Sequence, residues 1–161
     1  QFPVDAQSIH TSPLLINFKF YKNEILPNDW CNVRQPIWDM SDQYNPCPSG
    51  WRVPNVADFN NLLSYGSTWV NSAEGGMDNL PGRWYGGNHS TNRDGSVFFP
   101  AAGLIGSQGL SSYRFSGPQG NYYSVEVSGN DAYRLRLTST ISGVFTINRA
   151  AGLSVRCVKS L

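Results

Sequence analysis

Two arginines near the C-terminal end of the chain, Arg134 and Arg136, alternate with apolar residues. Successive side chains of a β-strand point to opposite faces of its sheet, so we expect Tyr133, Leu135 and Leu137 to face a core. The two arginines then share the other face, where each guanidinium needs water, a charged partner or a ligand. A solvated face with a cross-strand ion pair is the simpler explanation from composition, and a recognition surface is the alternative, because arginine forms forked hydrogen bonds and stacks on rings.

Residues of the types that act in catalysis are not spaced as in known catalytic motifs. The 11 carboxylates are scattered, without a pair placed for general acid and base roles. The sequence contains neither a nucleophilic-serine turn nor a phosphate-binding loop. The three cysteines, Cys31, Cys47 and Cys157, include no closely spaced pair, and the two histidines are far apart, which argues against a zinc site. We expect no enzymatic activity, no cofactor and no metal.

The composition is that of a globular protein with few charges. The 161 residues are 40% hydrophobic and only 14% charged, which fits one folded domain. A net charge of +1 provides no basic field for nucleic acid, and no apolar run approaches the roughly 20 residues that span a bilayer. We therefore expect no nucleic-acid partner and no direct membrane insertion. The odd number of cysteines allows at most one disulfide and leaves one free thiol.

Turn-forming and aromatic residues predict a loop-rich, mostly β architecture with one long helix; the chain has 16 glycines, 10 prolines and 13% aromatic residues. Residues 54–66 are the predicted helix, with Asn55 as its N-cap and Gly66 at its end. Residues 67–95 are predicted as a long loop, and residues 1–12 as a linker or the end of a preceding segment. The rest, 13–161, is a single domain in this prediction, with strands at 14–20, 97–106, 121–127, 132–138, 143–147 and 153–158.

The parity of the polar residues predicts a register for the hairpin that carries the arginines. A three-residue loop at 129–131 would place Glu126 opposite Arg134. In the same register Ser124 lies opposite Arg136, so that all four polar side chains share one face. This face then holds either a cross-strand ion pair, worth about 0.2–1 kcal/mol, or a ligand.

Four segments in order resemble one bacterial family. Residues 45–63, NPCPSGWRVPNVADFNNLL, resemble the signature DPCPxGWRVPT followed by a helix, and residues 152–159, GLSVRCVK, resemble the terminus GFSVRCVK. Between them, residues 97–106 and 120–127 resemble the blocks FPAAGYR and GYYWSS. These motifs are typical of the Fibrobacter succinogenes major paralogous domain, which is common in surface proteins of Bacteroidetes. The resemblance covers about residues 28–160.

The resemblance implies an α+β fold similar to that of C-type lectins, with small antiparallel-rich sheets, one or two helices and long loops. It also implies a disulfide between Cys47 and Cys157, because both lie inside family motifs, and it leaves Cys31 free. The motifs of calcium-dependent sugar binding in the broader lectin group are missing, so we expect no calcium site. The implied location is extracellular, on a bacterial cell surface or a phage tail.

The ending of the chain also resembles the variable proteins of diversity-generating retroelements. In those proteins a reverse transcriptase rewrites selected codons, and the diversified side chains lie on the exposed face of the last strands. The resemblance implies a non-enzymatic receptor or adhesin for an unknown protein or glycan, with no oligomeric state assigned. The candidate ligand-binding residues are Tyr113, Arg114, Ser124, Glu126, Arg134, Arg136, Thr138, Ile141, Phe145 and Ile147.

Two other interpretations stay open. In the first interpretation, the chain is a structural or assembly module of a surface appendage, such as a fimbrial tip, without a soluble ligand. In the second it is a divergent enzyme of the related formylglycine-generating fold, and turnover would then be lost on mutating Cys31. Fold likeness alone does not decide between them, because one fold hosts many functions.

Overall fold

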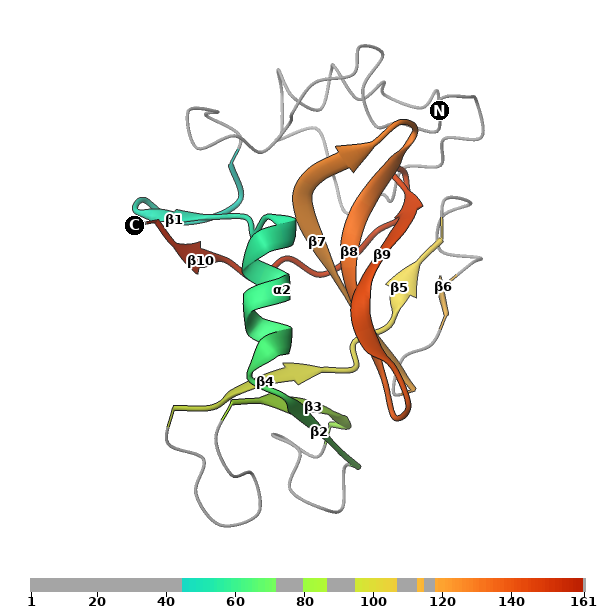
Figure 1. Cartoon of the computed structure of the whole chain (residues 1–161). Helices are drawn as coiled ribbons and strands as arrows, with labels where there is room; N and C mark the ends of the chain where they lie inside the picture. Colours follow the sequence, from blue (N-terminus) through green and yellow to red (C-terminus); the bar gives the residue numbers. More distant parts are fainter. Residues whose placement is uncertain (1–44, 72–79, 87–94, 107–112, 115–117, 161) are drawn as a thin grey trace.

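The computed structural model describes residues 45–71, 80–86, 95–106, 113–114 and 118–160, with only the backbone at 113–114. This part of the chain is a small α+β unit with one helix and several antiparallel sheets, as the sequence predicts (Figure 1). The expected linker at 1–12, the expected strand at 14–20 and Cys31 lie outside the described residues.

The helix and the strands form a few small layers. Helix α2 spans Val56–Ser64. Two three-stranded sheets contain β2 (Ser67–Val70), β3 (Gly82–Tyr85) and β4 (Val97–Pro100), and β7 (Gln119–Ser128), β8 (Asp131–Thr138) and β9 (Ser142–Asn148). Two short pairs join β1 (Trp51–Arg52) to β10 (Val158–Lys159), and β5 (Leu104–Ile105) to β6 (Tyr113–Arg114). In Figure 1 the β7-β8-β9 sheet stands beside α2, and the β2-β3-β4 sheet lies below both.

Helix α2 begins where the sequence predicts. The side chain of Asn55 accepts a hydrogen bond from the Asp58 amide at 2.8 Å, and the Asp58 carboxylate accepts one from the Asn55 amide at 2.8 Å. This capping box satisfies two backbone donors that a helix N-terminus otherwise leaves unpaired. Gly66, with a φ of +71°, follows the helix and adopts a left-handed conformation that suits glycine. The prediction of this helix is confirmed.

One core joins α2 to both three-stranded sheets. Its buried members are Phe59, Tyr85, Phe99, Ala101, Tyr122, Leu135 and Leu137. Phe99 lies between two tyrosine rings in edge-to-face contacts, with centroids 5.3 Å from Tyr85 and 4.8 Å from Tyr122. Leu135 and Leu137 of β8 have no exposed surface, so one side of the β7-β8-β9 sheet is fixed by packing.

The predicted loop at 67–95 is wrong where β2 and β3 lie. Each of these strands has only four residues, too few for an alternating pattern to stand out in the sequence. Gly82 is needed in β3, because a Cβ there would overlap Phe98 and Phe99. Trp84 is buried and packs on Phe98 with ring centroids 5.0 Å apart, so it anchors the sheet.

The last predicted strand, 153–158, is also different in the structure. Only Val158–Lys159 forms a strand there, β10, which pairs with β1. Before it, Gly152 and Ser154 make isolated bridges to Ile105 and Tyr122, so this segment runs along the edge of β7. The predicted disulfide between Cys47 and Cys157 is confirmed, with Cα atoms 5.8 Å apart.

Candidate ligand-binding face

The hairpin of β7 and β8 has a different register from the predicted one. Tyr123 lies opposite Arg134 and Asn121 lies opposite Arg136. The strands are joined by a two-residue turn, because Ser128 pairs with Asp131. Between Tyr123 and Val127, β7 has three residues where β8 has one, Tyr133, so a bulge changes the parity. The parity argument assumed an unbroken ladder, and its register is wrong.

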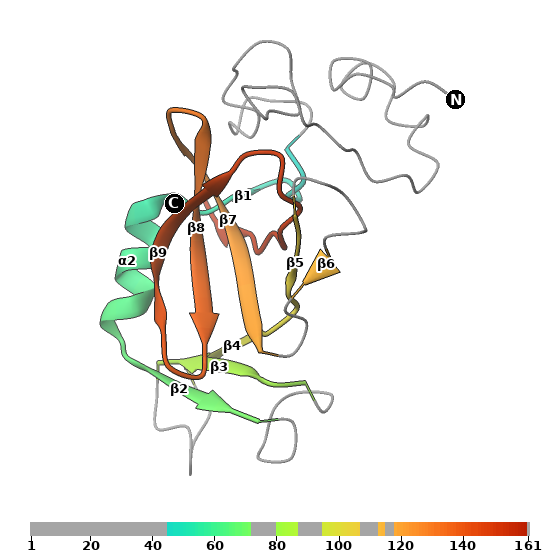
Figure 2. The same ribbon diagram turned by 90° about the vertical axis from the view of Figure 1, so that its right-hand side faces the viewer.

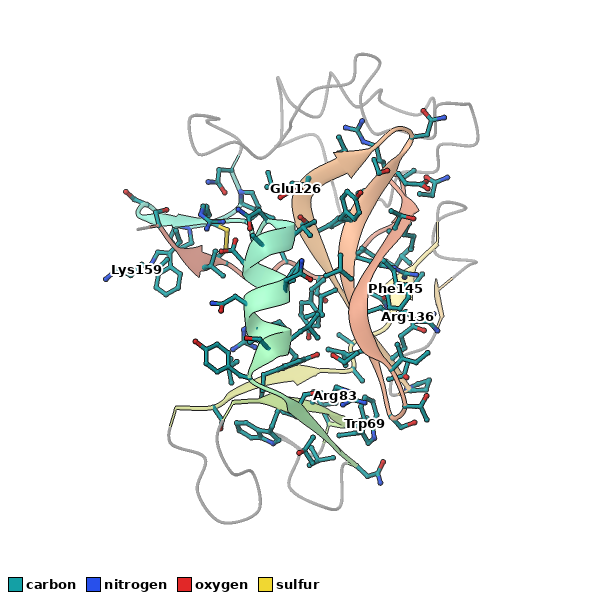
Figure 3. The ribbon with its side chains drawn as sticks, in the orientation of Figure 1. Trp69, Arg83, Glu126, Arg136, Phe145 and Lys159 are labelled. Atoms are coloured by element: carbon teal, nitrogen blue, oxygen red, sulfur yellow. A yellow bond between two sulfur atoms is a disulfide. The ribbon has the colours of Figure 1, made fainter. Side chains whose placement is uncertain are left out.

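Ser124 and Glu126, predicted as partners of the arginines, lie in this bulge and leave their face. The Ser124 side chain is buried, with 2% of its surface exposed, and its Oγ accepts a hydrogen bond from the Glu126 amide at 3.1 Å. The expectation that Ser124 is exposed is therefore wrong. The Glu126 carboxylate accepts a hydrogen bond at 3.1 Å from the Val56 amide in the first turn of α2. Figure 3 shows Glu126 at the end of α2, apart from Arg136.

The sheet carries its polar groups on the side opposite α2, which is turned toward the reader in Figure 2. We call this side the arginine face. Its residues are Asn121 and Tyr123 of β7, Arg134 and Arg136 of β8, and Phe145 and Ile147 of β9. Leu135 and Val144 alternate with them and pack on the core side. The strands thus separate the residues that hold the fold from the arginines, as the sequence predicts for β8.

The β7 half of the arginine face is covered and fixed by backbone. The Tyr123 hydroxyl donates to the carbonyls of Arg149 and Ala151, and the Asn121 amide nitrogen donates to the Gly103 carbonyl at 3.2 Å. Tyr123 and Asn121 are accordingly buried. The β9 half is more open, because 40% of the Phe145 surface is exposed.

Arg134 is held by a neutral partner. Its Nη1 donates to Asn121 Oδ1 at 2.6 Å, and the same oxygen accepts a hydrogen bond from Gln119 Nε2 at 3.0 Å. Its Nε is buried without an acceptor. Burial, and secondly the charge of Arg136, lower the pKa of Arg134 to about 10, although Tyr123 opposes this shift. The charge of Arg134 is thus poorly stabilised by its surroundings.

Arg136 lies next to an aromatic ring. Its guanidinium carbon is 5.9 Å from the centroid of Phe145, within the range of a cation–π contact. Gly143 leaves room for this ring, because a Cβ there would lie 3.1 Å from Phe145 Cε2. The Nε of Arg136 is also buried without an acceptor. Figure 3 shows Arg136 and Phe145 side by side, on the side of the sheet away from α2.

Two other arginines of the chain have more polar partners than Arg134 and Arg136 do. Arg52 forms an ion pair with Asp58, whose two oxygens both accept hydrogen bonds from it. Arg83 donates from three nitrogens, to the carbonyls of Thr138 and Ser139 and to a serine hydroxyl. In the part of the chain that the structure describes, neither Arg134 nor Arg136 forms an ion pair.

The other candidate residues are placed as follows. Thr138 Oγ1 accepts hydrogen bonds from the amides of Thr140 and Ile141, which closes the turn between β8 and β9. Ile141 is exposed in this turn, and Ile147 is half-buried on the arginine face. Tyr113 and Arg114 form strand β6 against β5, and their side chains lie outside the described residues. The structure thus brings four of the predicted residues together: Arg134, Arg136, Phe145 and Ile147.

Sequence reasoning missed the residues that orient the arginines. Gln119 and Asn121 lie at the start of β7, and their role follows only from the observed register. Gly143 had a weak signal, since a glycine inside a strand often marks a close approach of another group.

Comparisons with known proteins add no identification. No protein-family model matches the chain, and searches of the curated proteins and of the solved structures give no match. Among the described residues, His, Cys, Asp and Glu side chains form no group of three that could hold a metal ion. In the same residues no helix is long and apolar enough to cross a membrane.

Proposed function

We propose that this chain is a non-enzymatic ligand-binding domain, a receptor or adhesin, and that the arginine face makes the contacts. One observation carries this proposal: two adjacent guanidiniums lie on a sheet face beside a half-exposed phenylalanine, without an ion-pair partner in the described residues. Groups that fold stability does not require are candidates for binding. The packed core and the disulfide keep this face rigid, which limits the entropy lost on binding.

The finer fold assignment belongs to the same proposal. The quoted motifs support a C-type lectin-like fold, and they support a variable protein of a diversity-generating retroelement. In such a protein the rewritten side chains share one face, and Arg134, Arg136, Phe145 and Ile147 do so here. Two of the motif segments are joined by the disulfide between Cys47 and Cys157.

The proposed location is extracellular, on a bacterial cell surface or a phage tail. A disulfide persists in an oxidising compartment, and the one between Cys47 and Cys157 is consistent with this location. Export would also expose the arginine face to ligands outside the cell.

A binding screen with matched variants tests the function. The oxidised chain is applied to arrays of glycans and of bacterial surface proteins, together with the triple variant R134M/R136M/F145A. A second variant, Y65A/K159Q, removes an exposed ring and a cation elsewhere; Lys159 lies across the molecule from Arg136 in Figure 3. We expect the native chain and Y65A/K159Q to bind the same ligand. The triple variant should no longer bind it, although its melting temperature should not fall below that of the native chain.

Equal binding by all three proteins would contradict the assignment of this face. If no ligand binds and the purified chain forms ordered oligomers, the assembly-module interpretation replaces the proposal. Sequencing the 3′ end of the gene in a natural population tests the retroelement separately. We expect substitutions at the codons of Arg134, Arg136 and Phe145, and few at Leu135.

A further inference from the structure

The arginine face has positive charge without a counterion among the residues that the structure describes. Arg134 and Arg136 are two residues apart in β8, so their side chains leave the same face about 7 Å apart. The repulsion between them contributes to the lowered pKa of Arg134. The carboxylate that the sequence predicted opposite Arg134, that of Glu126, is bound to the N-terminus of α2 instead. The described residues therefore leave a pair of cations that an anion would stabilise.

The guanidiniums are oriented before any ligand binds. Asn121 fixes one Nη of Arg134, and Asn121 is itself fixed by the Gly103 carbonyl and by Gln119. Phe145 lies beside the guanidinium of Arg136. Because the Nε atoms of both arginines are closed to solvent, a ligand has to approach the terminal nitrogens. Terminal nitrogens in such a fork match the two oxygens of a carboxylate.

Exposed apolar side chains lie on the same face as the arginines. Phe145 is 40% exposed there, and Val127, on the same side of the sheet as Ala132 and Arg134, is 47% exposed. Apolar surface around a charged centre is typical of a protein interface, in which arginine and aromatic residues carry much of the binding energy.

We propose that the ligand is a protein segment that places an aspartate or glutamate carboxylate on Arg134 and Arg136 and an adjacent apolar side chain on Phe145. This inference rests on the proposed function, and it adds the chemistry of the partner. Charge complementarity favours the acidic group, and the exposed apolar side chains of Phe145 and Val127 favour an apolar peptide side chain next to it.

Selection from a random 12-residue peptide library, displayed on phage, tests the inference on the oxidised full chain. Peptides that are enriched are then synthesised with a fluorescent label, and their affinities are measured by anisotropy for the native chain and for R134M, R136M, R136K and K159Q. We expect enriched peptides to contain Asp or Glu next to Phe, Leu or Trp. R134M and R136M should each weaken binding by about 10- to 100-fold, the range for a charged hydrogen bond. R136K, which keeps the charge but loses the fork, should also weaken it, and K159Q should leave it unchanged.

Three results would overturn the inference. The first is enrichment of peptides without acidic residues, or of no peptide at all. The second is an affinity that R134M and R136M do not change. The third is binding of an acidic glycan, with heparin and a sialylated oligosaccharide as probes, through these arginines while acidic peptides do not bind; the proposed function would then survive with a different ligand. Failure of the proposed function is distinct, since the triple variant R134M/R136M/F145A would then bind every ligand found on the arrays as tightly as the native chain does.

Discussion

Replacing Arg134 with methionine is expected to stabilise the fold, although it removes a hydrogen bond. Methionine keeps the apolar stem of the side chain and eliminates a charge that the surroundings support poorly. Asn121 keeps a donor to its side-chain oxygen, because Gln119 Nε2 lies 3.0 Å from it. The variant also removes the buried Nε that has no acceptor, and such a group costs about 1–3 kcal/mol.

The magnitude follows from the protonation of Arg134. The lowering of the pKa of Arg134 from the ordinary arginine value to about 10 corresponds to an upper limit of about 3 kcal/mol, and solvent around this half-buried group reduces it to about 2 kcal/mol. This cost already includes the buried Nε without an acceptor, and the lost hydrogen bond to Asn121 offsets about 1 kcal/mol of it. We therefore expect R134M to raise the free energy of unfolding by about 1 kcal/mol, or the melting temperature by about 2–4 °C.

The pH dependence has a definite sign. The folded-state pKa of Arg134 is below its unfolded value, so the unfolded chain binds more protons than the folded chain as the pH rises through about 10. The destabilising effect of the charge is complete below pH 10 and is relieved as the pH rises. The advantage of R134M is thus largest at neutral pH.

Urea denaturation of the oxidised chain at pH 7 measures this effect, with R83M as the matched control. Arg83 is buried and donates to Thr138 O at 2.8 Å, Ser67 Oγ at 2.9 Å and Ser139 O at 3.1 Å. Its loss removes three hydrogen bonds of a buried side chain, and R83M should lower the free energy of unfolding by about 2–4 kcal/mol. A loss of more than about 1 kcal/mol for R134M would refute the reasoning, because Arg134 would then be a structural residue like Arg83.

Three further predictions concern the supports of the arginine face. Replacing Cys47 and Cys157 by serine should lower the free energy of unfolding by about 4–5 kcal/mol, from the entropy of a loop with a separation of 110 residues; urea denaturation of native and variant chains measures it. D58N should lower the free energy of unfolding by about 1–2 kcal/mol at pH 7. Hydrogen bonding to Arg52 lowers the pKa of Asp58, so the stability that its carboxylate contributes is present above pH 4 and is lost in acid. Unfolding curves of the native chain and of D58N should therefore converge in acid. G143V should displace the Phe145 ring from Arg136, because a Cβ would lie 3.1 Å from the ring, and aromatic NMR shifts would report this; unchanged shifts would contradict it.

Local patterns carried enough information for α2 and for β8. The cap at Asn55 and the stop at Gly66 act within a few residues, so they are readable from the sequence and agree with the structure. The alternation around Leu135 identified the buried side of β8 for the same reason, because neighbouring side chains point to opposite faces. What the pattern supplies is the face of a residue and not its partner.

Partners depend on distant segments, and there the predictions failed. The bulge between Tyr123 and Val127 exists because Glu126 reaches the first turn of α2, 70 positions earlier in the chain, while Ser124 turns inward to accept the Glu126 amide. No local signal reports that contact. The tie from Asn121 to Gly103 is equally non-local. Resemblance to a family supplied the disulfide, which spacing alone left open.

Adjacent residues of β8 meet opposite demands, and this affects how the arginine face responds to mutation. Leu135 and Leu137 are fully buried, so truncating either to alanine costs about 2–5 kcal/mol. Among the described residues, the guanidinium of Arg134 contacts Asn121 and that of Arg136 contacts Phe145, and the charge of Arg134 is destabilising. We therefore expect these two positions to accept other side chains while the core stays unchanged. The proposed receptor with a changing set of ligands requires this separation between exchangeable residues and the residues that hold the fold.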